Sequence, residues 1–395
     1  MEQGVAVIGT GQTDFRSVDR ERTYAEQAQA AAKEALDDAG LTPDDIEAVV
    51  FSLAPTAFMG IAEADRWALD YVWGNGKPTM RVHTGGATGG SAVHAGYSLI
   101  RSGIFRTVLL VGADRMAETP DAQYFLNQVW DRFYEKDLSI QTIVAGAFLG
   151  QQYMHLYGAT EEDFARVVVR QRGNALNNPH AHLKGKITID EVMGSARLSY
   201  PLKLYDCCPR SSGGAAMILG NLDMAKQCSG RPAFIKGLGA VSNTVFLGDR
   251  IVSPAHPDLI GPMLEHQVAA NRAYERAGIT DPSREIQVAE IYDPFSTMVH
   301  PALEMMGFCG KGLAAKLEKE GAWESGGMVY VNPSGGTLCT NPISVTGLVR
   351  NIEAARQVMG RAEAMQAPNV KHALATAVGG SGQFVNVTVY GEDYL

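Results

Sequence analysis

The chain has 395 residues, of which 46% are hydrophobic and 19% are charged, and its formal net charge is −9. A folded chain of this length forms two domains or one large layered α/β body, and the composition excludes intrinsic disorder. Because the charge is negative and no long basic run or membrane-length apolar stretch occurs, we expect neither nucleic acid nor a membrane as a partner.

The cysteines and histidines bear on location and metal binding. Five cysteines, an odd number without a disulfide-like framework, predict a reducing cytoplasm, and the chain reaches its first strand without a leader-like segment. His180 and His182 have a spacing that metal ligands use, but no acidic or cysteine cluster lies nearby. We therefore expect no metal site and interpret both as solvated loop histidines.

The first predicted elements recur later in the chain. Residues 4–9 form a predicted buried strand, residues 24–39 an amphipathic helix, and a turn then leads to a strand ending at Phe51. Residues 271–291 repeat this order of helix, Ala-Gly, polar turn and strand, which indicates duplicated half-domains. We expect the first half to span residues 1–255 and the second half residues 256–395.

The remaining elements alternate in type. Further strands are predicted over residues 105–114, 215–219, 372–378 and 384–390, and a further helix over 345–359. Such alternation predicts a parallel-dominated sheet with helices on both faces. The interval at about residues 115–200 is an insertion in the first half that we expect to cover the site.

Four glycine-containing segments fall at predicted strand ends, where α/β proteins collect their ligand sites. They span residues 83–91, 290–296, 332–347 and 377–383. The first, His-Thr-Gly-Gly-Ala-Thr-Gly-Gly-Ser, follows a strand and opens a small-residue helix.

These segments, with Tyr-Asp-Cys-Cys-Pro at 205–209, Gly-Gly-Ala-Ala-Met-Ile-Leu at 213–219 and Met-Gly-Phe-Cys-Gly-Lys-Gly at 306–312, resemble the thiolase superfamily over nearly the whole chain. The resemblance is to the sterol-carrier or lipid-transfer thiolase branch. Within it, the chain resembles the core subunits of two-subunit aryl-ketoacyl-CoA thiolases of the benzoylsuccinyl-CoA type and of CoA-dependent steroid side-chain aldolases.

The resemblance implies an α/β thiolase fold, with two similar halves in a five-layered αβαβα arrangement that the internal repeat supports. It also implies a homodimer, an acyl-CoA substrate, and a small partner subunit built from a zinc ribbon and an OB-fold. Coenzyme A would be a substrate or product moiety, and no bound cofactor is expected.

The family's reactive side chains are replaced in this chain. Where the family pattern implies two cysteines and two histidines, the matching positions hold Gly86, Tyr292, Asn341 and Ala377, and the match of Asn341 requires a one-residue deletion. Cleavage through a cysteine at position 86 is therefore not expected. The aldolases of the branch carry a second tyrosine where this chain has Pro342.

The replacements still allow carbon–carbon chemistry on a thioester. We expect Tyr292 to donate and accept the proton, and Asn341 with loop N–H groups near Gly86 and Gly380 to stabilise an enolate oxygen. Three roles stay open: Asp293 orients Tyr292 or caps a turn, His83 contacts the substrate or holds its loop, and Cys339 is a substitute nucleophile or a packing residue. The glycine loops add expected substrate and CoA contacts at Gly335, Gly336, Gly379 and Ser381.

Three functions are compatible with these residues. The first expectation is thiolytic, retro-Claisen cleavage of a bulky aromatic or polycyclic β-ketoacyl-CoA. The alternatives are retro-aldol cleavage of a β-hydroxyacyl-CoA and a non-catalytic subunit that carries acyl-CoA or lipid. Cys207, Cys208 and Cys309 adjoin apolar segments and are interpreted as packing residues.

Overall fold

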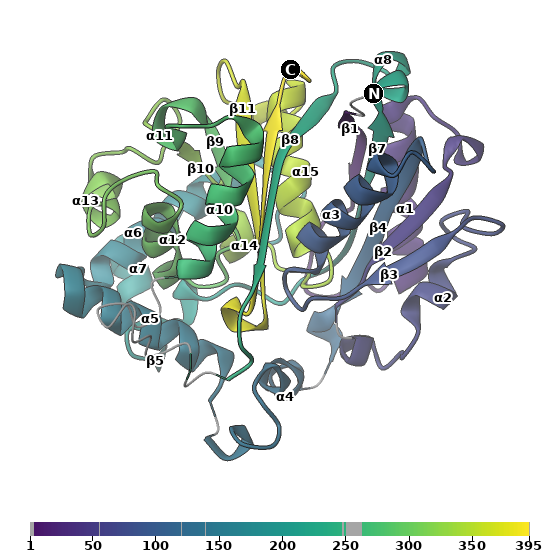
Figure 1. The fold of residues 1–395 in the computed structure, drawn as a ribbon. Helices are drawn as coiled ribbons and strands as arrows, with labels where there is room; N and C mark the ends of the chain where they lie inside the picture. The colour runs from purple at the N-terminus through teal and green to yellow at the C-terminus, as the bar shows by residue number, and fades with distance from the viewer. Residues whose placement is uncertain are drawn as a thin grey trace.

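The structure is a computed structural model that describes residues 4–54, 56–119, 121–138, 140–246, 249 and 263–394. It contains a ten-stranded sheet in the order β10-β9-β11-β12-β8-β1-β7-β4-β2-β3 (Figure 1). The strands are β1 Val5–Gln12, β2 Ala48–Ser52, β3 Thr79–Val82, β4 Thr107–Arg115, β7 Ser212–Asn221, β8 Ala233–Ser242, β9 Val288–Glu290, β10 Tyr330–Val331, β11 His372–Gly379 and β12 Phe384–Gly391. A separate pair comprises β5 Arg197–Ser199 and β6 Leu202–Lys203.

The helices fall into three groups. In the first half they are α1 Tyr24–Ala39, α2 Ala64–Ala68, α3 Thr88–Arg101 and α8 Leu222–Gln227, and in the insertion α4 Ala122–Leu126, α5 Thr142–Tyr157, α6 Glu161–Asn174 and α7 Ile189–Gly194. The second half has α10 Leu264–Ala277, α11 Pro282–Glu285, α12 Val299–Met305, α13 Ala314–Lys319, α14 Gly336–Cys339 and α15 Thr346–Met359. None of the helices described is long and apolar enough to cross a membrane.

Local sequence explains why α1 has the bounds predicted for it. Thr23 and Glu26 form a capping box at its start, and Gly40 ends it with φ of 70°. Between these signals a stripe of alanines faces the sheet and is fully buried. The predicted helix over 24–39 is therefore confirmed residue for residue.

The sheet is mixed, which corrects the expected parallel-dominated sheet. Strands β2, β3 and β4 run parallel, as do β9, β10 and β11, but β7 runs antiparallel to β1 and β4. The four residues between β11 and β12 are too few for a parallel crossover, so β12 must return antiparallel. Alternation along the chain does not reveal such reversals.

The two half-sheets join narrowly between β1 and β8, where Ala6 pairs with Phe234 and Val7 with Ala233. Strand β8 pairs along its length with β12 of the second half. The pairing of β8 with β12 places residues 233–242 in the second half-sheet. The division of the chain after residue 255 stays a prediction.

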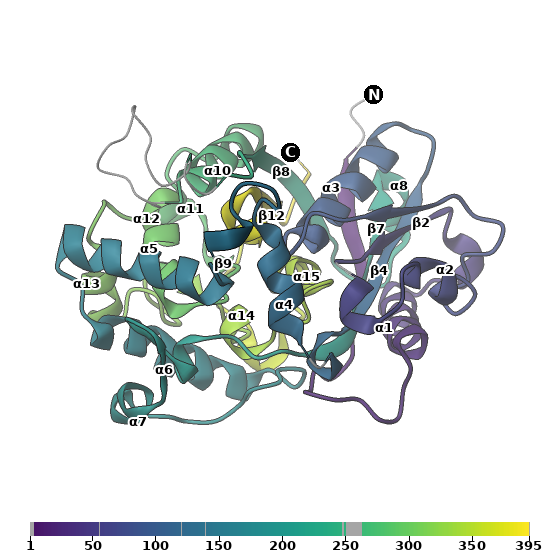
Figure 2. The same ribbon diagram turned by 90° about the horizontal axis from the view of Figure 1, so that it is seen from below.

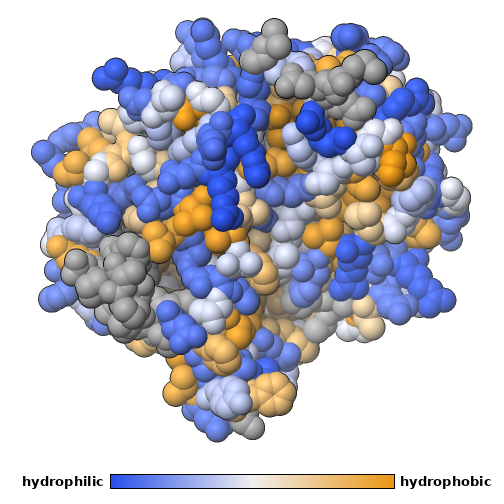
Figure 3. Space-filling model, in the orientation of Figure 1, coloured by the Kyte–Doolittle hydropathy of each residue, from blue (hydrophilic) through white to orange (hydrophobic). Residues whose placement is uncertain are grey.

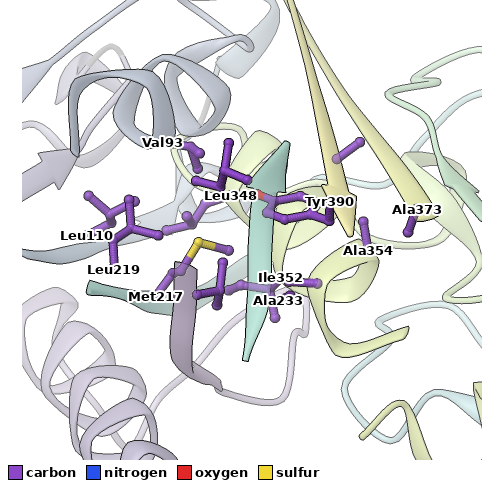
Figure 4. Close-up of a cluster of buried hydrophobic side chains, with 14 of the residues drawn as sticks. Val93, Leu110, Met217, Leu219, Ala233, Leu348, Ile352, Ala354, Ala373 and Tyr390 are labelled. Carbon is purple, nitrogen blue, oxygen red and sulfur yellow. The ribbon is translucent and has the colours of Figure 1, made fainter. Parts of the chain in front are cut away.

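The layers are those of the expected five-layered thiolase fold. Helix α1 covers the outer face of the first half-sheet and α10 that of the second, while α3 and α15 lie between the halves (Figure 1). An extensive apolar core fills this middle layer, where side chains such as Val93, Leu348 and Ile352 meet (Figure 4).

In the middle layer the backbones of α3 and α15 touch. A Cβ atom built on Gly89 would lie 1.9 Å from the backbone nitrogen of Leu348, and one built on Gly347 would lie 2.9 Å from the nitrogen of Gly90. These separations are shorter than any van der Waals contact. Only glycine therefore fits at this helix crossing.

The insertion packs against the second half and covers the lower ends of the strands, as Figure 2 shows for α4, α5 and α6. A buried ion pair helps to hold it, because Arg170 of α6 donates from Nε to Glu318 of α13 at 2.7 Å. Aromatic side chains nevertheless reach solvent on the insertion, with Phe133 85% and Tyr134 82% exposed. Apolar residues are visible on the lower projection of the face in Figure 3, where Figure 1 places α4.

Replacing Gly89 with alanine should lower the free energy of unfolding by about 1–3 kcal/mol, because the new methyl group forces α3 and α15 apart. Chemical denaturation at constant protein concentration measures this change. The matched control is Gly173→Ala inside α6, where a built Cβ has no neighbour within 4 Å and alanine should be neutral or stabilising. Equal stability of the two variants would contradict the close helix crossing.

Candidate active site

A cavity of about 1040 Å³ lies between the two halves and the insertion. Its floor is formed by two glycine turns, one from each half, together with Tyr292, Asn341 and Cys208. Its walls are largely apolar and come mainly from the insertion. The apolar residues include Phe125, Leu126, Val129, Ile143, Phe148 and Leu149. Residues from the interval 115–200 therefore form much of the cavity lining.

The two glycine turns contact each other through their backbones. A Cβ atom on Gly379 would lie 2.0 Å from the carbonyl oxygen of Thr84, and one on Gly85 would lie 3.2 Å from the nitrogen of Gly380. Gly85, Gly380 and Ser381 all have positive φ, at 62°, 58° and 53°. The structure thus brings together Gly86, Gly379, Gly380 and Ser381, which all line the cavity.

Gly86 and Tyr292 share one small volume. A Cβ atom built on Gly86 would lie 2.3 Å from Tyr292 Oη and 3.0 Å from its Cζ. The tyrosine hydroxyl therefore occupies the space that any side chain at position 86 would need. The absence of a side chain at one position and the presence of a phenol at the other are a single structural feature.

Tyr292 is fixed at the end of β9. Its backbone N–H donates to Thr376 Oγ1 of β11 at 2.8 Å, and only 6% of the residue is exposed. Burial raises the pKa of its hydroxyl well above the usual value, and nearby Cys208 and Asp293 raise it further. The phenol is therefore protonated at neutral pH and faces the cavity as a proton donor.

Asn341 presents its amide to the cavity in a fixed orientation. Its Oδ1 accepts from Thr346 Oγ1 at 2.8 Å, and its Nδ2 donates to Cys208 Sγ at 3.1 Å. Its backbone N–H donates to Ser211 Oγ at 3.0 Å. An amide nitrogen carries two hydrogens and Cys208 takes one, so the other is available to a ligand.

Cys208 is the site residue that the sequence analysis assigned to packing. It is half-buried, lines the cavity and accepts from Asn341. Burial raises the pKa of its thiol to about 12, so it is not a thiolate at neutral pH. The Cys-Cys-Pro segment is the only sequence signal that could have placed Cys208 in the site, because its hydrogen-bond partner Asn341 lies 133 residues away in the chain.

Asp293 supports the loop beneath the floor instead of orienting the tyrosine hydroxyl. Its carboxylate accepts from Gln171 Nε2 at 2.5 Å and from the backbone N–H of Thr337 at 2.8 Å. Burial raises its pKa to about 7. Gly336 belongs to the same contact, because a Cβ there would lie 2.7 Å from Asp293 Oδ1.

Five predicted residues lie outside the cavity lining, namely Asp293 and Gly336 together with Cys339, Gly335 and His83. Cys339 is fully buried beside Ala175 and Ala181, and burial raises its pKa to about 12, so the structure does not bring its thiol to the cavity. Gly335 packs against Ala175 in the same region. His83 is exposed, although partial desolvation of its ring and the charge of nearby Arg81 lower its pKa.

His182 is not the solvated loop histidine that the sequence suggested. Its ring contacts Ser17 Oγ at 3.1 Å and Ser211 Oγ at 2.9 Å, and Ser211 in turn accepts from the backbone of Asn341. His180 lies 3.3 Å from Asp14. Across the described ranges no cluster of three or more side chains suited to a metal ion occurs.

Comparisons with known proteins agree with this architecture. The family model described as the thiolase N-terminal domain matches residues 5–196, and the thiolase C-terminal domain-like model matches residues 253–392. A steroid side-chain-cleaving aldolase of Thermomonospora curvata is 30% identical and covers 98% of both chains. An acetyl-CoA acetyltransferase of Methanothermobacter thermautotrophicus is 29% identical over 98% of this chain and 99% of its own.

A solved structure named Ltp2-ChsH2(DUF35) aldolase has a TM-score of 0.82 at 28% identity, covering 99% of this chain and 98% of its own. Its fold therefore agrees with this one over nearly the full length of both chains.

Replacing Gly86 with alanine should lower the free energy of unfolding by about 1–3 kcal/mol, because the methyl group meets Tyr292 Oη. Adding Tyr292→Phe should recover part of that loss, and a double-mutant cycle should give a coupling of about 0.5–3 kcal/mol. Recovery is partial because the carbonyl oxygen of Val378 also crowds the new atom.

The control cycle pairs Gly86→Ala with Tyr274→Phe, whose hydroxyl donates to the carbonyl of Met306 elsewhere in the second half. Those two changes should add without coupling. Additive behaviour of the Tyr292 pair as well would show that the phenol does not occupy the position assigned to it.

Proposed function

This chain is a carbon–carbon bond-cleaving enzyme of the thiolase superfamily, and we propose that it cleaves a bulky β-hydroxyacyl-CoA by a retro-aldol reaction. The observation that carries the proposal is the hydroxyl of Tyr292 in the space beside Gly86. The protonated phenol of Tyr292 lies next to position 86, and glycine at that position supplies no nucleophile.

The proposed reaction breaks the bond between Cα and Cβ of the thioester. Its electron pair goes to Cα and forms a thioester enolate, while the β-hydroxyl loses its proton and becomes a ketone or aldehyde. The enolate then takes a proton at Cα and leaves as a shorter acyl-CoA. In total one proton moves from the β-oxygen to Cα, so no external base or oxidant is needed.

Tyr292 suits this transfer because a phenol can accept one proton while it donates its own. Its raised pKa keeps the proton on the oxygen until the enolate forms. The enolate oxygen needs hydrogen-bond donors, which the second hydrogen of Asn341 Nδ2 and the loop N–H group at Gly86 would supply. The apolar walls fit an aromatic or polycyclic acyl group.

Thiolysis, the first expectation from the sequence, is the second candidate. A relative named acetyl-CoA acetyltransferase at 29% identity favours it. Position 86 offers no thiol, however, and burial keeps the thiol of Cys208 protonated. The thiol of free CoA must then attack the β-ketone directly, and two CoA groups must enter one cavity together. Retro-aldol cleavage requires one CoA group only. Relatives named as an acetyltransferase and an aldolase favour catalysis. The carrier hypothesis draws its support from relatives named sterol carrier protein 2, such as the human one at 28% identity over 98% of this chain.

The assembly is also part of the proposal. Strand β3 ends the sheet with Thr79 and Met80 exposed, and Trp67 of neighbouring α2 is 69% exposed. An open, partly apolar edge of this kind favours pairing with a second copy, so we place the homodimer contact there. The solved relative named with a DUF35 component supports the zinc-ribbon and OB-fold partner. Five free cysteines agree with a reducing cytoplasm.

Tyr292→Phe should reduce kcat about 10²- to 10⁴-fold with the partner subunit present, because the proton relay is lost. The assay follows the release of ketone or aldehyde from aromatic and polycyclic β-hydroxyacyl-CoA thioesters, with and without free CoA. The control is Tyr274→Phe, which removes a buried hydroxyl outside the cavity and should leave turnover unchanged.

Two outcomes would contradict the retro-aldol proposal. Unchanged turnover in Tyr292→Phe would remove the assigned role of the phenol. A strict requirement for free CoA, with a second thioester as product, would establish thiolysis in its place.

Met80→Lys should convert the dimer to a monomer, because a charge at the centre of the β3 edge resists pairing. Light scattering coupled to size-exclusion chromatography measures the mass. Met328→Lys is the control, since Met328 is 42% exposed near β10 at the opposite end of the sheet. A dimer that persists in the first variant would contradict this interface.

A further inference from the structure

Among the residues that the structure describes, Arg172 and Arg210 are the arginines that line the cavity, although the protein as a whole is acidic. Arg172 lies in the last turn of α6 and is half-buried, whereas Arg210 follows the Cys-Cys-Pro segment and is exposed at the rim. Their neighbours on the same cavity wall are largely apolar and include Leu183, Leu198 and Leu204. A wall of this kind favours ligands that combine an apolar body with an anionic group.

Neither guanidinium has a carboxylate partner within 4.0 Å among the residues that the structure describes. Other arginines of α6 are paired, since Arg166 contacts Glu162 at 2.5 Å and Arg170 contacts Glu318 at 2.7 Å. Arg172 instead lies over the ring of Tyr205, with its Cζ 5.8 Å from the ring centroid. The aromatic ring holds the cation in place and leaves its N–H groups for another acceptor.

Two carboxylates of the described residues also line the cavity. Asp249 and Glu265 come from the segments that follow β8 and begin α10. Each carboxylate accepts a hydrogen bond from a nearby side chain. Asp249 accepts from Thr244 Oγ1 at 3.5 Å, and Glu265 accepts from Asn243. Neither carboxylate forms an ion pair with Arg172 or Arg210 in the part of the chain that the structure describes.

We propose that Arg172 and Arg210 form a subsite for an anionic oxygen group of the ligand, a carboxylate or a phosphate. The planar guanidinium groups match either acceptor with paired hydrogen bonds. The inference rests on the proposed function only in taking the ligand to be a CoA thioester, which carries phosphates and can carry an acyl carboxylate.

Position favours the carboxylate of an acyl group as the source. Arg210 is two residues from Cys208, which bonds to the Asn341 amide. Arg172 is close enough to Cys339, two residues before Asn341, to oppose the burial that raises the pKa of that thiol. The subsite thus adjoins the reacting end of the cavity, whereas the long pantetheine arm separates the phosphates of CoA from the thioester.

The test compares binding of simple probes to wild type and to the double variant Arg172→Met and Arg210→Met. The first pair of probes is 2-naphthoate and its neutral amide, and the second pair is CoA and pantetheine, which lacks phosphates. Isothermal titration gives each Kd without any need for turnover. Arg166→Met, on the same helix but paired on the surface, is the control.

An acyl-carboxylate subsite predicts that wild type binds naphthoate roughly ten- to a hundred-fold more tightly than the amide, and that the double variant loses this preference while its affinity for CoA is unchanged. A phosphate subsite predicts instead a loss of CoA affinity of similar size with pantetheine unaffected. Both outcomes support the anionic subsite and identify its source.

Unchanged Kd values for all four probes, in a double variant that keeps the melting temperature of wild type, would overturn the inference. The proposed reaction is tested separately, because a failure of retro-aldol turnover leaves these binding constants intact. Conversely, a double variant that cleaves neutral substrates at the wild-type rate would limit the arginines to recognition.

Discussion

The contact between the backbones of α3 and α15 sets the geometry on which the site depends. Gly89 and Gly347 let the helices approach to a distance that no side chain permits. Helix α3 begins just after the Gly85-Gly86 turn, and α15 begins five residues after Asn341. Because the two helices fix each other, the elements that precede them converge on one cavity, although they belong to different halves of the chain.

Within that frame the floor of the cavity behaves as one unit. The phenol of Tyr292 fits because Gly86 lacks a side chain, and the two glycine turns allow the hydroxyl to lie close to the backbone. Asn341 is held from both sides by Thr346 and Cys208, so its amide is oriented before any ligand binds. Such preorganised dipoles stabilise developing charge without a cost of reorganisation during the reaction.

Sequence was sufficient where local signals decide structure and insufficient where distant contacts do. The capping box and terminal glycine of α1 define its bounds locally, and the glycine turns and Tyr292 lie where the motifs predicted. The role of Asp293 could not be derived, because its partner Gln171 is 122 residues away in the insertion. The same holds for Cys208, whose partner Asn341 is 133 residues away, and for Arg172, which lies in the insertion.

The shared volume of Gly86 and Tyr292 also constrains how this site can change over generations. A cysteine at position 86 is accommodated only after the phenol has been replaced, and a smaller residue at 292 alone leaves an empty space beside a glycine. Either substitution made alone therefore gives a less stable protein, with a steric clash in one case and a cavity in the other. The steric conflict therefore makes the effects of substitutions at positions 86 and 292 depend on each other.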